Sequence, residues 1–223
     1  MDAIVLAGGF GTRLQSVVKE IAKPMALIND KPFLAYLIEY LKGFGINNVI
    51  LSVGYKKESI QNYFNASYHD VTICYSEEET PLGTGGAIKK ALQMTTSPKV
   101  LVINGDTFFR LDIIRFIESM KNEQIALALK PMSDFDRYGS VVLNNGKVVS
   151  FEEKKPMKEG LINGGVYLID KTIFQTTHEE VFSFETFLQN QQKIGGFVCE
   201  GYFIDIGIPE DYFKAQQDFK EMF

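Results

Sequence analysis

A glycine-rich loop that directly follows a short apolar run restricts this chain more than any other feature. The segment LAGGFGTRL, residues 6–14, stands behind the apolar residues AIV and contains Gly8, Gly9 and Gly11. Glycine tolerates positive φ and lets backbone N–H groups approach the oxygens of an anion closely. The segment therefore predicts a strand, a tight loop and a phosphate-binding site close to the start of the sequence.

The two best-known phosphate loops do not fit this segment. A dinucleotide-binding fingerprint that starts at Gly9 meets Leu14 where its last glycine belongs, which disfavours an NAD-dependent oxidoreductase. A Walker A loop ends in Gly-Lys-Ser/Thr, whereas Gly11 is followed here by Thr12 and Arg13. Because a guanidinium keeps its charge and forms forked hydrogen bonds to phosphate, we expect Arg13 to clamp a polyphosphate.

Apolar runs and helix-period segments alternate through the first half of the chain. Short apolar runs predict strands at residues 3–6, 48–53, 71–75 and 99–103. The segment FLAYLIEYLKGFG at 33–45 has apolar residues at i, i+3 and i+4, as an amphipathic helix does. A second helix is predicted to bury Leu111, Ile114, Ile117 and Met120. This alternation indicates an α/β fold whose central sheet is mixed, mainly parallel and flanked by helices.

The second half has a different pattern. YGSVVLNNGKVVSFEEK, residues 138–154, predicts a β-hairpin that turns at Asn145 and Gly146. The segments GGVYLID and GGFVCEGYFI predict further strands, with helical stretches between them. Because neither a low-complexity linker nor an internal repeat interrupts the chain, we expect a single domain over residues 1–223.

Composition narrows the classes of function. The net charge is −5, so no broad cationic surface invites nucleic acid or an anionic membrane. Cys74 and Cys199 form no disulfide framework and lack metal-ligand spacing, so we expect both to be reduced packing residues. No apolar run approaches the ~20 residues of a membrane span and no signal peptide precedes the glycine loop. We therefore expect a cytoplasmic protein.

Seven segments, in order along the whole chain, resemble the signature of the sugar-1-phosphate nucleotidyltransferase family. They are LAGGFGTRL at 6–14, AKP at 22–24, PLGTGGA at 81–87, NGDT at 104–107, EEK at 152–154, INGGVY at 162–167 and DIGIPEDY at 205–212. The chain departs from the family pattern at Ile208, where threonine is usual, and at Ser16, where proline is usual. Many members carry an extra C-terminal module, and we expect none in this chain.

The resemblance implies a Rossmann-like (GT-A-like) fold and a reaction of a nucleoside triphosphate with a sugar 1-phosphate to give a nucleotide-sugar and pyrophosphate. The short length and INGGVY look most similar to the branch that transfers GMP from GTP to D-glycero-α-D-manno-heptose 1-phosphate for surface polysaccharide synthesis. Mannose 1-phosphate with GTP, or glucose 1-phosphate with UTP or dTTP, are alternatives. A non-catalytic nucleotide-sugar sensor is a different class. Oligomeric state stays open, although short members of the family commonly form homodimers.

The chemistry implied needs positive charge more than a base. Its nucleophile is a phosphate oxygen that is already anionic, and neither histidine of the chain lies in a motif. The enzyme must align two polyanions and neutralise the charge that develops. The resemblance assigns catalytic roles to Arg13, Lys23, Asp106 and Asp205, with Lys23 beside the α-phosphate and the incoming sugar phosphate. It assigns nucleotide binding to Leu6, Ala7, Gly8, Gly9, Gly11, Thr12, Arg13, Glu78, Gly83 and Thr84.

Two aspartates are candidates for a magnesium site. Asp106 follows the apolar run VLVIN, and Asp205 follows GYFI and precedes Gly207. A pair of carboxylates on one Mg²⁺ leaves coordination positions for phosphates and water, as this ion prefers. A single aspartate behind a strand can instead cap a helix, and for Asp112 we favour that interpretation.

The segment EEK is expected to bind the sugar. The resemblance assigns the sugar phosphate to Lys154 and the sugar hydroxyls to Glu153, with Asn163 and the backbone around Gly139 completing the pocket. The alternative is a solvated hairpin end, because FEEKKPMKEG at 151–160 is strongly charged.

Glu78 indicates which base is bound. By the resemblance, the residue five positions before the glycine of LGT meets the edge of the base. Guanine presents N1–H and N2–H₂ as adjacent donors, and a carboxylate accepts from both, whereas an amide suits uracil or thymine better. Glutamate therefore favours GTP. The alternative is that the acidic run SEEET at 76–80 is only solvated.

Overall fold

The computed structural model describes residues 1–9, 14, 17–18 and 21–223. Gly11, Thr12 and Arg13, all assigned above to the phosphate loop, lie outside the described residues. The strands are β1 (Asp2–Leu6), β2 (Leu27–Ile28), β3 (Lys31–Pro32), β4 (Asn48–Val53), β5 (Ser67–Tyr68), β6 (Val71–Glu77), β7 (Lys99–Asn104), β8 (Thr107–Phe109), β9 (Ile125–Phe135), β10 (Ser140–Asn144), β11 (Lys147–Phe151), β12 (Met157–Asp170), β13 (Gly195–Val198) and β14 (Phe203–Asp205). The helices are η2 (Lys23–Met25, a single 3₁₀ turn), α1 (Phe33–Gly43), α2 (Lys57–Phe64), α3 (Gly83–Leu92), α4 (Ile113–Met120), α5 (Phe184–Gln189) and α6 (Pro209–Met222).

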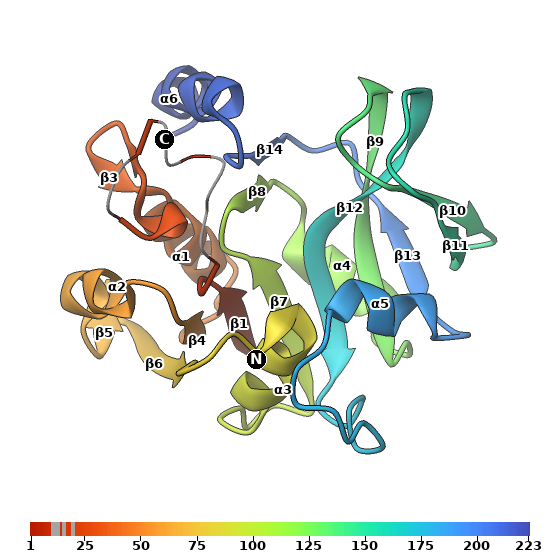
Figure 1. Ribbon diagram of the computed structural model, residues 1–223, viewed down its shortest axis with the longest axis horizontal. Coiled ribbons are helices and arrows are strands. Elements are labelled where there is room, and N and C mark those ends of the chain that lie inside the picture. The colour runs from red at the N-terminus through yellow and green to blue at the C-terminus, as the bar shows by residue number, and fades with distance from the viewer. Residues whose placement is uncertain (10–13, 15–16, 19–20) are drawn as a thin grey trace.

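One sheet runs through both halves of the described chain (Figure 1). Its ten strands follow the order β10-β11-β13-β9-β12-β7-β1-β4-β6-β5. The neighbours β7, β1, β4 and β6 are parallel, and β13 is parallel to β9. The long strand β12 is antiparallel to both β7 and β9. The sheet is therefore mixed, as predicted, with three of its parallel pairs gathered in the N-terminal half. It is not mainly parallel, because four of its pairings in the described chain are parallel and six are antiparallel, most of the latter contributed by the hairpin and long strands of the second half.

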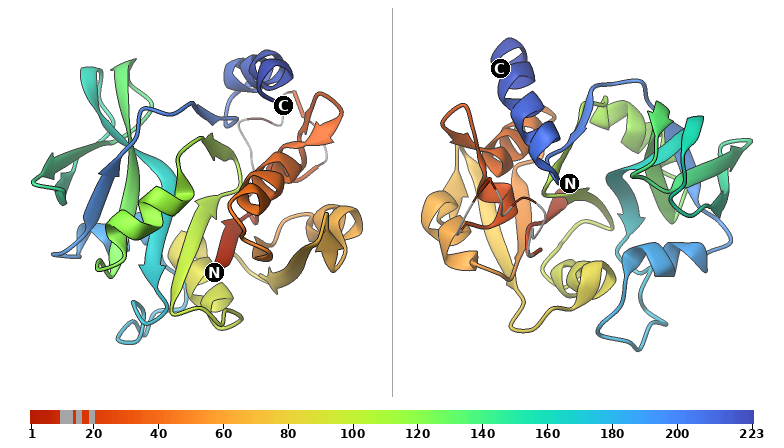
Figure 2. Two further views of the ribbon diagram at one scale, coloured as in Figure 1. Left: turned by 180° about the vertical axis from the view of Figure 1, so that it is seen from behind. Right: turned by 45° about the horizontal axis from the view of Figure 1, so that its top comes forward.

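Helices cover both faces of this sheet and enclose two apolar layers. Along β1, Ala3 and Val5 pack in the layer that contains α1, α4 and α6, whereas Ile4 packs in the layer that contains α3 and α5. Successive residues of a strand point to opposite faces of the sheet, so alternate side chains of β1 pack in opposite layers. The view from behind shows α1 and α4 on the face opposite α3 and α5 (Figure 2).

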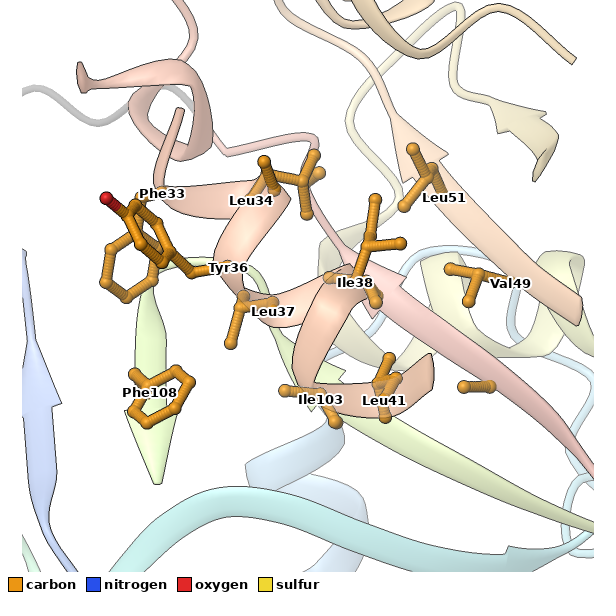
Figure 3. Packing of buried hydrophobic residues seen from close by; sticks show 14 of the residues in the cluster. Phe33, Leu34, Tyr36, Leu37, Ile38, Leu41, Val49, Leu51, Ile103 and Phe108 are labelled. Carbon is orange, nitrogen blue, oxygen red and sulfur yellow. The ribbon is translucent and has the colours of Figure 1, made fainter. Parts of the chain in front are cut away.

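Helix α1 illustrates how the sequence pattern sets the packing. Its apolar face lies against strands of the sheet (Figure 3). The buried residues shown there include Leu34, Leu37, Ile38 and Leu41 of the helix and Val49, Leu51 and Ile103 of β4 and β7. Each such side chain contributes roughly 1.5–3 kcal/mol on burial, which anchors the first βαβ unit.

The hairpin and the strands of the first half agree with the sequence prediction. Asn145 and Gly146 both have positive φ (47° and 73°) between β10 and β11, as a type I′ turn requires. Asp112 caps α4, because its side chain accepts from the Arg115 N–H at 2.9 Å. Both cysteines are free thiols, as expected.

Two local predictions were wrong. Ile114 was expected on the apolar face of this helix, yet its side chain is 57% exposed, because the face of α4 that packs on the core follows i, i+3, i+4 and i+7 from Ile113: Ile113 and Phe116 are buried, and Ile117 and Met120 are partly buried. GGFVCEGYFI was expected as one strand, but residues 199–202 separate β13 from β14. At this break Gly201 lies so close to the Arg110 carbonyl oxygen that a Cβ atom would not fit.

The carboxyl ends of the parallel strands meet at one edge of the sheet. The register pairs Leu6 of β1 with Ser52 of β4 on one side and with Asn104 of β7 on the other. Leu6 and Asn104 are the last residues of their strands, and Ser52 is one residue before the end of β4. The loops after these strands therefore begin at the same edge. Ligands of open α/β sheets bind at such an edge.

Candidate active site

A first cavity of about 570 Å³ opens at this edge of the sheet. Of the residues assigned to the nucleotide or to catalysis, it is lined by Leu6, Gly8, Gly9, Lys23, Glu78, Gly83, Thr84 and Asp106. Ala7 does not line it: the side chain is buried in the core, and its N–H donates to the Ser52 carbonyl at 2.8 Å. The structure thus brings together parts of four separated motifs around one hollow.

Glu78 holds a fixed position in this cavity. Its Oε2 accepts from the Leu82 N–H at 3.0 Å, and its Oε1 accepts from the Ser52 hydroxyl at 3.2 Å. The Oε1 atom also faces the glycine loop, since a Cβ atom placed on Gly8 would lie 2.8 Å from it. A carboxylate can accept about four hydrogen bonds, so roughly two positions remain for a ligand.

The other acidic residues of SEEET are arranged differently. Glu77 accepts from Lys57 at 2.6 Å and from Gln61 at 2.8 Å, on the side of α2, and does not line the cavity. These two donors lower the pKa of Glu77. Glu79 lines the cavity but is exposed. Of the three, only Glu78 is both in the cavity and held by its neighbours, so the run is more than a solvated loop.

Helix α3 begins at the wall of the first cavity. Gly83 has φ +69°, and a Cβ atom on it would lie 2.5 Å from the Phe182 carbonyl oxygen, so glycine is required here. Thr84 comes next, and its hydroxyl accepts from the Phe184 N–H at 2.8 Å and donates to Glu185 at 2.8 Å. The PLGT motif therefore joins α3 to the segment that leads into α5, in addition to shaping the cavity.

Lys23 and the two aspartates form one cluster. The antiparallel pairing of β8 with β14 sets Asp205 opposite Thr107, and the Ile206 N–H donates to the Asp106 carbonyl at 3.0 Å. The Lys23 ammonium lies 2.6 Å from Asp106 Oδ2 and 3.4 Å from Asp205 Oδ1, and this lysine is only 9% exposed. A cation therefore already lies between the two carboxylates.

The electrostatics of this cluster favour a positive charge. Burial, followed by the negative charge of Asp106, raises the pKa of Asp205, while Lys23 opposes the rise. Two partly buried carboxylates that share one ammonium form a site of oxygen donors for a cation. In the described part of the chain no group of three or more His, Cys, Asp or Glu is arranged around a common point, so the described residues offer this cluster two carboxylates, Asp106 and Asp205. That donor set fits Mg²⁺, which keeps water and phosphate ligands, better than a metal that needs a closed protein cage.

A second cavity, of about 340 Å³, adjoins the first. Asn104 and Gly207 line both. Asp106 lines the first cavity and Asp205 lines the second. Arg137 and Tyr138 also line the second cavity, and the Arg137 guanidinium is 2.9 Å from Asp211 of α6.

The sugar-binding residues predicted from the sequence are placed unevenly. Lys154, Gly139 and Asn163 line the second cavity, whereas Glu153 is exposed and lines neither cavity. The amide of Asn163 is engaged within β12: its Nδ2 donates to the Tyr167 hydroxyl at 2.9 Å, and its Oδ1 accepts from the Gly165 N–H at 3.0 Å. Asn163 therefore fixes the bend of β12 at the cavity wall, and the role of Glu153 stays a prediction.

Several lining residues carried no assignment from the sequence. They are Ser52, Asn104, Arg137, Tyr138, Glu185 and Gly207. Burial, together with the charge of Asp205, raises the pKa of Tyr138 to about 12, so its phenol keeps the proton and can donate. Ser52 had one signal, as the single polar residue in the apolar run VILSV at 49–53. A polar side chain that is fully buried at a strand end needs a partner, and here the partner is Glu78.

Comparison with known proteins fits this arrangement. The family model described as Nucleotidyl transferase matches residues 2–222, and the chain belongs to this family. It is 52% identical over 226 residues to a D-glycero-alpha-D-manno-heptose 1-phosphate guanylyltransferase of Aneurinibacillus thermoaerophilus, with 98% of each sequence covered. It is 53% identical over 218 residues to the Campylobacter jejuni protein of the same name, with 96% of this chain and 97% of the relative covered.

A solved structure agrees with the fold. HddC from Yersinia pseudotuberculosis, crystallised in complex with GMP-PN, matches with a TM-score of 0.90 at 42% identity, covering 98% of this chain and 99% of that one. The predicted family and the Rossmann-like α/β fold class are thereby confirmed. Among the helices of the described residues, none combines the length and the apolar character needed to cross a membrane.

Proposed function

We propose that this chain transfers GMP from GTP to D-glycero-α-D-manno-heptose 1-phosphate, forming the GDP-heptose and pyrophosphate. The observation that carries the proposal is the pair of adjoining cavities with the Lys23, Asp106 and Asp205 cluster at their junction. The first cavity offers a fixed carboxylate, and the second offers cationic groups. The relatives named for this reaction, at 52% and 53% identity over nearly the full length, support the choice of substrates.

In this proposal the first cavity holds GTP. Glu78 accepts from N1–H and N2–H₂ of guanine with the acceptor positions that Ser52 and Leu82 leave open. The glycine loop, which includes Gly8 and Gly9, follows the triphosphate, and Arg13 adds its charge. A carboxylate facing the Watson–Crick edge of uracil or thymine would meet their carbonyl oxygens, so the same group discriminates against UTP and dTTP.

The second cavity holds the sugar 1-phosphate. Lys154 and Arg137 line it and can neutralise the phosphate. An oxygen of that phosphate attacks the α-phosphorus of GTP, the bond from this phosphorus to the β-phosphate oxygen breaks, and pyrophosphate leaves. The nucleophile carries no proton that must be removed, so the protein contributes alignment and charge neutralisation. Lys23, at the junction of the two cavities, is positioned to pair with the α-phosphate.

Asp106 and Asp205 would hold Mg²⁺, and the ion would neutralise phosphate oxygens and orient the triphosphate. The rest of the mechanism depends on groups of this chain. We also propose that the chain acts as one nucleotidyltransferase domain and works in the cytoplasm, where GTP is made available.

Pyrophosphate release is the experiment that tests the proposal. The enzyme is incubated with Mg²⁺, each of five nucleoside triphosphates and a panel of hexose and heptose 1-phosphates. Release restricted to GTP with the manno-configured heptose supports the proposal. Release with GTP and mannose 1-phosphate would overturn the sugar, and release with UTP or dTTP and glucose 1-phosphate would overturn the base. If no pair gives release while calorimetry detects nucleotide-sugar binding, the chain is a sensor and the proposed activity is wrong.

A further inference from the structure

Glu153, the glutamate that the sequence pattern offers to the sugar hydroxyls, lines neither cavity, so a carboxylate that lines the second cavity is a stronger candidate for binding a sugar hydroxyl. Asp205 lines that cavity but is engaged with Lys23. Asn163 also lines it, with its amide engaged within β12. A sugar carries several hydroxyl donors, and each donor taken out of water needs a partner. Among the described residues, Glu185 is the other carboxylate that lines the second cavity.

We propose that Glu185 binds a hydroxyl group of the sugar 1-phosphate and thereby helps to select the sugar. This inference rests on the function proposed above and adds to it a residue from a segment that no motif covers.

The Glu185 side chain is exposed, but two hydrogen bonds hold its carboxylate before any ligand binds. Its Oε2 accepts from the Thr84 hydroxyl and from the Ser183 hydroxyl, both at 2.8 Å. Among the described residues, both hydroxyl donors to this side chain reach Oε2, so Oε1 keeps its acceptor capacity for the cavity. A group that is already held in place loses little conformational entropy on binding, which strengthens the contact with a ligand.

Thr84 connects this acceptor to the first cavity. Thr84 lines the first cavity and Glu185 lines the second, and α3 and α5 lie side by side (Figures 1 and 2). The Thr84 hydroxyl also accepts from the Phe184 N–H, so one side chain of α3 fixes the start of α5 and the direction of the glutamate. Thr84 is therefore a positioning residue for sugar binding as well as part of the nucleotide wall.

Replacement of Glu185 by glutamine tests the proposal with little change in shape. The glutamine oxygen can still accept from Thr84 and Ser183, which leaves its NH₂ group facing the cavity as a donor. We expect the KM for the sugar 1-phosphate to rise about ten- to a hundredfold, the range for loss of a charged hydrogen bond, while the KM for GTP stays within about threefold. Glu185→Asp withdraws the carboxylate by one methylene and should give a smaller rise.

Glu180→Gln is the matched control, because Glu180 is exposed in the same segment and lines neither cavity. It should leave both KM values unchanged, and thermal unfolding should give similar midpoints for all variants. Monodeoxy sugar 1-phosphates identify a direct contact. The analogue that lacks the hydroxyl bound by Glu185 should have a raised KM with the wild-type enzyme. Its KM should not rise further in Glu185→Gln.

The outcomes separate this inference from the proposed function. An unchanged KM for the sugar in Glu185→Gln, or equal rises in the KM for sugar and GTP, would refute the role of Glu185 while the activity stands. A direct contact would also be refuted if, for every deoxy analogue, the rise in KM caused by the missing hydroxyl and the rise caused by Glu185→Gln were additive. Wild-type enzyme that releases no pyrophosphate with any sugar would refute the proposed function itself.

Discussion

Glu78→Gln is the perturbation that tests most directly how the base is chosen. In the wild-type protein the carboxylate accepts from the Leu82 N–H and the Ser52 hydroxyl, and its Oε1 faces the glycine loop. The backbone N–H of Leu82 can only donate, so the glutamine oxygen has to take the Oε2 position. The hydroxyl of Ser52 can rotate and accept instead. The variant therefore presents an NH₂ group on the side of the cavity where the wild type presents an oxygen.

The size of the effect follows from this forced orientation. A hydrogen bond to a charged group contributes about 1.5–3 kcal/mol, and the lost acceptor now faces a guanine donor. We expect kcat/KM for GTP to fall roughly ten- to two-hundredfold, since 1.4 kcal/mol corresponds to a factor of ten. UTP should lose little or should improve, because an amide can donate to a uracil carbonyl and accept from N3–H.

The assay is pyrophosphate release at a saturating concentration of the sugar 1-phosphate, with GTP and UTP varied in separate series. Glu79→Gln is the control, because Glu79 lines the same cavity but is exposed. It removes the same charge from the same loop and should change kcat/KM by less than about threefold. Equal losses for GTP and UTP in Glu78→Gln, or equal losses in the two variants, would show that the base is read elsewhere.

Three further predictions concern the cation site, the glycine at the start of α3 and the pH dependence of stability. Asp106→Asn and Asp205→Asn should each lower turnover more than about a hundredfold with an unchanged circular dichroism spectrum, and unchanged activity in both would refute the metal assignment. Gly83→Ala should cost at least about 1–2 kcal/mol in urea unfolding, because φ is +69° and the Cβ meets the Phe182 carbonyl, whereas Gly43→Ala, with nothing within 4 Å, should cost nothing; equal effects would contradict the steric argument. Burial would raise the pKa of Asp2, but hydrogen bonds from Asn48, Ser97 and Thr96 outweigh it and lower the pKa from 3.8 to about 2. A lowered folded-state pKa stabilises the fold above the unfolded value, so about 2 kcal/mol should be lost as the pH falls from about 4 to about 2, and Asp2→Asn should not show this loss in an unfolding titration.

The first half of the fold could be predicted because its signals are local. Each parallel strand is a short apolar run, and α1 has a single apolar stripe, so periodicity alone defines the βαβ units. The prediction failed at α4, where two pairs of adjacent apolar residues, Ile113–Ile114 and Phe116–Ile117, allow more than one choice of buried face, and Ile113 rather than Ile114 is buried. It also missed the 11-residue strand β9, whose N-terminal half is buried on both faces and therefore lacks the alternation of a half-exposed strand.

In the candidate site too, residues in local sequence patterns could be predicted, whereas a residue defined by tertiary contacts could not. Lys23, Asp106 and Asp205 stand in short segments with a recognisable pattern, and the structure gathers them within one cluster. Glu185 could not be found this way, because a glutamate just after a serine N-cap reads as an ordinary start of a helix. Its role depends on a hydrogen bond to Thr84, which lies 101 positions earlier in the chain. Such a pairing depends on how the chain after β12 returns to place α5 beside α3, and the residue spacing within either segment gives no sign of it. The candidate residues for phosphate and cation binding can therefore be predicted from the sequence, whereas Glu185 becomes a candidate only when the two cavities are seen to adjoin.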